Sequence, residues 1–165
     1  METESGETKL NEFLLFIMRG FPESIGLISL CLVLSGVPVL WKRVSVFAVF
    51  LTLITYIIRH SPIFFGFHSL VIIFLIIGYM WKYLNVLLKK AMISGLLGFF
   101  ILGILEYMNY IFFLLVMDLD LDLFINSADP ISILVFLPQS IAMILLAITG
   151  NAFLKNQKEV ELIDN

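Results

Sequence analysis

The sequence predicts an all-α integral membrane protein, a helical bundle with about five transmembrane helices. Three observations predict this class. The 165 residues are 61% hydrophobic and only 14% charged, with a mean hydropathy of +1.05, and a soluble domain of this size could not hide so much apolar surface. The apolar residues form continuous runs, whereas an outer-membrane barrel needs alternation. Basic residues gather between alternate runs, as they do in multi-pass proteins of the inner membrane.

Five apolar runs are candidates for the spanning helices, because a helix needs about 20 mostly apolar residues to cross the hydrocarbon core. They cover residues 24–40, 44–58, 67–83, 91–117 and 131–153. These runs divide the chain into a polar N-terminal tail (1–9), a transmembrane helical domain (10–154) and a short cytoplasmic tail (155–165).

The first run follows a short amphipathic stretch, residues 10–21. Pro22 is expected to divide the two, since proline favours the first turn of a helix or marks a kink. In an alternative with six spans, residues 10–40 form a re-entrant pair. The number of spans therefore depends on how the chain is arranged before residue 41.

The distribution of basic residues predicts an N-terminus outside the cell and a C-terminus inside. Seven of the ten Lys and Arg residues lie in segments that five spans place on one side: Lys42, Arg43, Lys82, Lys89, Lys90, Lys155 and Lys158. Basic residues are enriched on the cytoplasmic side of membrane proteins, and Trp41 and Trp81 lie beside them, as interfacial tryptophans do. We therefore expect a multi-pass protein of the bacterial inner membrane.

Polar residues within the apolar runs fall at one depth. Counted from the nearest inner basic residue, Arg59, Glu106 and Gln139 each lie 16 residues away, which is about 24 Å along a helix. The same count places Glu23 at about 28 Å and His68 at about 21 Å. Each of the five spans therefore contributes a polar group to one layer, in the outer half of the membrane.

This layer is the candidate ligand-binding site, and six residues are assigned to it: Arg59, Glu106, His68, Glu23, Gln139 and Asn109. Asn109 is included because it lies one helical turn beyond Glu106. Charges in hydrocarbon usually face the bundle interior and pair, so we expect Arg59 to pair with Glu106. Arg19 or a histidine is expected to pair with Glu23. The layer is either a pocket, open to the outside, for a small or peptidic ligand, or a structural network that fixes helix register.

Metal binding and catalysis are not expected. His60 and His68, the only histidines, lie eight residues apart with no other strong ligand adjacent in sequence, whereas zinc requires three or four ligands. The run "DLDLDL" at 118–123 lacks the glycine and terminal glutamate of an EF-hand and is interpreted as a solvated outer loop. No nucleophile–base pair, phosphate loop, haem motif or nucleic-acid patch occurs in the sequence. We therefore predict no enzyme activity, no cofactor and no nucleic-acid partner.

Small residues on the fourth run predict close packing between helices. Ser94 and Gly98 form a small-xxx-small pair beside Gly95 and Gly103. Packing within the bundle is favoured over dimerisation. Cys31, the single cysteine, lies within an apolar run and is interpreted as a packing residue.

Three segments, "RGFPES" (19–24), "SGVPVLWKR" (35–43) and "YIIRHSPIFFGFHSL" (56–70), resemble the N-terminal membrane sensor regions of Gram-positive bacterial histidine kinases of the Agr-receptor-like type. The matching residues are Arg19, Pro22, Glu23, Arg59, Pro62, Phe65, Gly66 and His68. The resemblance covers about the first 70 residues, and the remainder agrees only in hydropathy. It implies a multi-span detector whose C-terminal end enters the cytoplasm. The dimerisation helix and ATPase domain of such kinases are absent, so autophosphorylation is not implied.

We favour a sensory or regulatory module that binds its ligand in the polar layer and signals to a partner, either a histidine kinase or another membrane protein. The alternatives are a small-solute-binding component of a transporter and a structural subunit of a larger membrane complex. The lipid bilayer is the partner that composition itself predicts.

Overall fold

The computed structural model describes residues 2–59, 67–117 and 130–163, and every element within these ranges is an α-helix. In chain order the helices are α1 (Glu2–Leu34), α2 (Trp41–Arg59), α3 (Phe67–Tyr83), α4 (Leu88–Met117) and α6 (Pro130–Ile163). Four of them, α1, α2, α4 and α6, contain stretches long and apolar enough to cross a membrane, and the apolar part of α3 is shorter. The predicted fold class, an all-helical membrane bundle, is confirmed.

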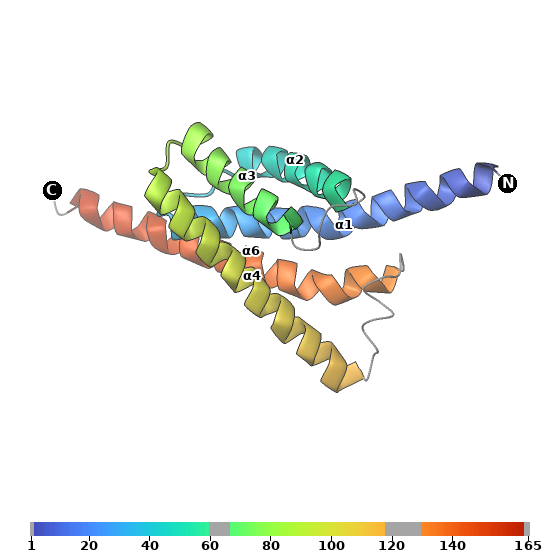
Figure 1. Cartoon of the computed structure of the whole chain (residues 1–165). Coiled ribbons are helices and arrows are strands. Elements are labelled where there is room, and N and C mark those ends of the chain that lie inside the picture. The colour runs from blue at the N-terminus through green and yellow to red at the C-terminus, as the bar shows by residue number, and fades with distance from the viewer. Residues whose placement is uncertain (1, 60–66, 118–129, 164–165) are drawn as a thin grey trace.

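Successive helices run in opposite directions, so the N- and C-termini lie at opposite ends of the bundle (Figure 1). Helix α1 is central, since it packs against α6 most extensively and also against α2 and α4. Helix α3 completes the bundle by packing on α4 and α2. This arrangement brings residues from all five helices to one cavity.

The first helix differs from the predicted arrangement, because Pro22 does not divide it. Helix α1 is continuous from Glu2 to Leu34 with Pro22 inside it, and the stretch with spanning character is Leu10–Leu34. Proline is tolerated inside membrane helices, where neighbouring groups and small backbone adjustments satisfy the carbonyl that it frees. The amphipathic stretch and the first apolar run are therefore one span, and a re-entrant pair is excluded.

The end of α1 falls six residues before the predicted limit of the first span. Gly36 has a φ of +80°, a conformation that glycine adopts without a Cβ penalty. The amide of Val37 donates to the carbonyl of Leu32, and the amide of Gly36 donates to that of Val33. These two bonds form a Schellman motif, which satisfies the last carbonyls of the helix.

The two predicted tails contain helix in the structure. Helix α1 begins at Glu2, within the segment 1–9, and α6 continues to Ile163, within the segment 155–165. The remaining limits agree closely with the sequence: α3 has the predicted bounds, and α2 and α4 each begin three residues earlier than predicted.

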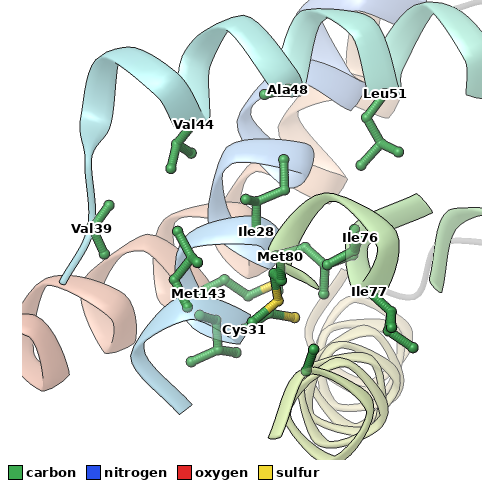
Figure 2. Close-up of a cluster of buried hydrophobic side chains, with 14 of the residues drawn as sticks. Ile28, Cys31, Val39, Val44, Ala48, Leu51, Ile76, Ile77, Met80 and Met143 are labelled. Carbon is green, nitrogen blue, oxygen red and sulfur yellow. The ribbon is translucent and has the colours of Figure 1, made fainter. Parts of the chain in front are cut away.

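The core gathers apolar side chains from every described helix. Figure 2 shows α1, α2, α3 and α6 contributing Ile28, Leu51, Met80 and Met143 to one cluster. Val39, from the connection between α1 and α2, closes the cluster at one end. In lipid, helices associate through close packing and hydrogen bonds, so this cluster fixes the positions of the helices around the polar layer.

Close helix packing at the small residues of α4 is confirmed within the bundle. Gly98 packs on Cys31 of α1, and a Cβ added at Gly98 would lie 2.5 Å from the Cys31 Sγ. Gly95 packs on Ile77 of α3, where an added Cβ would lie 2.9 Å from the side chain. An added Cβ at Gly103 would have open space within 4 Å. Cys31 is accordingly a packing residue, buried at the α1–α4 crossing.

Candidate ligand cavity

A partly enclosed cavity of about 130 Å³ lies between all five described helices. Its walls are formed by Phe16, Arg19, Gly20, Glu23, Ser24, Leu27, Leu51, Thr52, Thr55, Arg59, Ser69, Ile72, Phe99, Leu102, Glu106 and Gln139. An engineered cavity of about 150 Å³ binds benzene, and a single water needs roughly a tenth of that space. The cavity is therefore large enough for several waters or for one small organic molecule.

The cavity brings together four of the six residues assigned to the site, Arg59, Glu106, Glu23 and Gln139. The side chain of His68 lies outside the described residues, although its backbone belongs to α3. Asn109 is not part of the cavity wall, and its side chain or backbone has an interaction partner. Four residues that were assigned to one depth by counting along separate helices therefore line a single cavity. A role in ligand binding stays a prediction.

Four charged side chains face this space. Arg19 and Glu23 lie one turn apart on α1, Arg59 ends α2, and Glu106 lies in the middle of α4. Arg19 is attracted by Glu23 and by Glu106 and is repelled by Arg59. Within the described part of the chain, however, none of the four makes a direct ion pair of 4.0 Å or less with another. The four charges are instead arranged around a shared space, and the alternative pairing of a histidine with Glu23 lies outside the described residues.

Aromatic rings hold both arginines. The guanidinium carbon of Arg19 lies 3.2 Å from the centroid of the Phe136 ring, and Phe136 is buried. The guanidinium carbon of Arg59 lies 5.8 Å from the Phe16 ring, which itself packs edge-on against Tyr56. A cation over a ring face is attracted by the ring quadrupole. These contacts help to hold both guanidinium groups at the cavity wall.

The hydroxyl groups of the wall form a defined set of hydrogen bonds. Thr52 donates to the carbonyl of Ala48 over 2.8 Å, and Thr55 donates to the carbonyl of Leu51 over 2.8 Å. A hydroxyl carries a single hydrogen. Ser24 must therefore be the donor in its 3.1 Å contact with the Thr52 hydroxyl. The oxygens of both threonines consequently present acceptor lone pairs only.

Gln139 carries a buried acceptor without a partner. Its side chain is 3% exposed, and in the described residues no donor reaches its Oε1. Leaving a buried polar group unpaired costs about 1–3 kcal/mol. Buried polar groups are nearly always satisfied, so each exception requires an explanation. Gln139 belongs to the cavity wall, but its Oε1 itself is inaccessible even from the cavity.

Sequence reasoning missed the aromatic and hydroxyl members of the wall. Thr52 and Thr55 lie seven and four residues before Arg59, so helical spacing alone places them on the same face, and this signal was present in the sequence. Phe16 and Phe136 carry no such signal, since one phenylalanine among 16 in an apolar chain looks like any other. Their roles depend on tertiary contacts.

Two further expectations concern metals. Among the described residues, no group of three or more His, Cys, Asp or Glu side chains is placed to hold a metal ion. His60, Pro62, Phe65, Gly66 and the aspartate run at 118–123 lie outside the described residues.

In comparisons with known proteins, no protein-family model, no curated protein and no solved structure matches the chain.

Proposed function

We propose that the protein is a membrane sensor or regulator that binds a small polar ligand in the cavity and passes the binding event to a partner through α6. The observation that carries this proposal is the composition of the cavity wall. Two arginines and two glutamates surround a space that no described side chain fills. Charges within a membrane span usually mark a functional site.

The route to the partner would be α6. This helix carries Gln139 at the cavity and continues to Ile163 without interruption. Between these points, the Oδ1 of the buried Asn151 accepts a 2.9 Å hydrogen bond from the Val39 amide, which ties α6 to the connection between α1 and α2. A ligand that binds two packings of α6 with different affinity would shift the population between them.

The orientation and the partner are part of the proposal. With the N-terminus outside, the basic residues at the far end of the bundle face the cytoplasm, and the cavity opens toward the outer leaflet. Three residues of the Agr-receptor-like resemblance, Arg19, Glu23 and Arg59, line the cavity together. This supports a bacterial sensor role, with a histidine kinase or another membrane protein as the partner.

Access to the cavity from outside can be measured by thiol labelling. We expect a Thr55→Cys variant in intact cells to react with a membrane-impermeant, charged thiol reagent, because residue 55 lies in the cavity wall. Leu53→Cys, exposed on α2 but absent from the wall, is the matched control and should stay unlabelled in lipid. Cys31 is buried and can be retained. Equal protection of both positions would refute a ligand site open to the outside.

A second measurement separates a ligand site from a structural network. We expect Arg59→Gln and Glu106→Gln each to lower the free energy of unfolding by clearly less than the loss of a buried structural pair does, because both groups face the cavity. Breaking a buried structural pair costs about 3–5 kcal/mol instead. Losses of that size, restored by the charge-swapped double variant, would show that the polar layer only fixes helix register.

A further inference from the structure

We infer that the cavity selects a small zwitterion, a molecule with one ammonium group and one anionic group on a short skeleton, such as an α-amino acid. The inference rests on the proposed function and specifies its ligand class. It follows from three properties of the wall: the sign of its charges, the distribution of its donors and acceptors, and its size.

Among the charged groups of the wall, only the two arginines are hydrogen-bond donors. Arg19 and Arg59 both line the cavity, and each lies over an aromatic ring. The planar fork of a guanidinium donates in its plane and matches a carboxylate or phosphate with two parallel hydrogen bonds. The Phe136 ring, whose centroid lies 3.2 Å from the guanidinium carbon of Arg19, helps to hold this donor in the wall. This part of the wall suits an anionic group.

The wall also offers hydrogen-bond acceptors, from carboxylates and from hydroxyl groups. Glu23 and Glu106 are acceptors when ionised, and the hydroxyl hydrogens of Thr52 and Thr55 are already donated to backbone carbonyls. The Oε1 of Gln139 is buried and lacks a donor within the described residues. An ammonium group has three N–H donors and no acceptor. It is therefore a group that can donate hydrogen bonds to the carboxylate and hydroxyl oxygens of the wall.

Charge balance and volume limit the remainder of the ligand. When all four groups are ionised, the two arginines and two glutamates carry no net charge, and an occupant with a net charge would then be uncompensated in a medium of low dielectric. The volume of about 130 Å³ is close to that of a cavity that holds the six carbons of benzene. Small amino acids meet both conditions, and so does the phosphoethanolamine headgroup of a lipid.

The experiment uses the full chain in nanodiscs of phosphatidylglycerol, which has no amine. Calorimetric titrations with glycine, alanine and serine are compared with methylamine, acetate and glycerol, which carry one charge or none. We expect saturable binding of the amino acids and at least tenfold weaker binding of the other three probes. Equal affinity for acetate, methylamine or glycerol would overturn the zwitterion inference while leaving a polar ligand site intact.

Variants assign the two ends of the ligand. Arg59→Gln should weaken amino-acid binding at least tenfold, and Glu106→Gln should do the same through the ammonium group. Arg43→Gln is the matched control, because Arg43 is exposed and lies outside the cavity wall. This variant should bind amino acids with unchanged affinity. If both cavity variants bind amino acids as tightly as the unmodified chain does, the assigned site is wrong.

A second lipid composition distinguishes a free ligand from a lipid headgroup. In nanodiscs that contain phosphatidylethanolamine, continued binding of glycine supports a soluble ligand. Loss of glycine binding, together with phosphatidylethanolamine enriched in the purified protein, supports a headgroup of the same chemistry. If no amino acid binds in either disc and no phosphatidylethanolamine is enriched, the inference fails. Labelling of Thr55→Cys remains an independent test of the cavity itself.

Discussion

Replacing Gly98 by alanine should destabilise the bundle by about 1–3 kcal/mol, the usual cost of adding a methyl group to a tightly packed core. The added Cβ would lie 2.5 Å from the Cys31 Sγ, nearer than a non-bonded contact allows. Cys31 is 1% exposed and has little room to move, so α1 and α4 must separate. The free energy of unfolding in detergent, measured for both proteins under one condition, tests this.

Gly103→Ala is the control for that measurement, on the same helix. An added Cβ at Gly103 would meet no atom within 4 Å, so only the helix preference changes, and alanine gains about 0.5–1 kcal/mol over glycine in a helix. The two substitutions should therefore have opposite signs. A loss of stability at both positions would mean that α4 is generally intolerant of change, and the close crossing would not be its cause.

Gln139→Leu should raise the stability of the ligand-free protein by about 1–3 kcal/mol, which is the cost of an unsatisfied buried polar group. Leucine is similar in size and removes the Oε1 that lacks a donor within the described residues. The same change should weaken amino-acid binding, because Gln139 belongs to the cavity wall and leucine makes that wall less polar. Thermal unfolding with and without glycine measures both effects.

Ser29→Ala separates the two effects of that substitution. Ser29 is 0% exposed, and its Oγ also lacks a partner among the described residues, but it does not line the cavity. We expect the Ser29→Ala variant to be more stable than the unmodified protein and to bind amino acids with unchanged affinity. If Gln139→Leu destabilises the protein while Ser29→Ala stabilises it, Gln139 has a structural partner, and the argument from its unpaired oxygen is wrong.

The sequence predicts the helices well because hydropathy determines them directly. Continuous apolar runs can only be helices in a bilayer, where each backbone group must be satisfied within its own segment, and the limits of α3 agree with the structure residue for residue. Pro22 was misleading because its effect on a helix depends on its surroundings. In water it would favour a helix start, whereas here α1 continues through it.

The candidate site was partly predictable, for a geometric reason. Helices that cross one slab share a depth scale, so counting from basic anchors placed Arg59, Glu106 and Gln139 at one level, and the structure brings them to one cavity. Depth carries no information about rotation around a helix axis or about neighbours. The absence of direct ion pairs among the described charges, and the stacking of Arg19 on Phe136, therefore required the structure.

Helix α3 also bears on how the bilayer meets the cavity. Its 17 residues span about 25 Å, whereas the hydrocarbon core is about 30 Å thick. A helix shorter than the core thins the lipid around it, and this hydrophobic mismatch changes with membrane thickness. Ser69 and Ile72, near one end of α3, form part of the cavity wall. Thinning there would bring headgroups and water toward that wall, so lipid chain length would adjust how readily the cavity is reached.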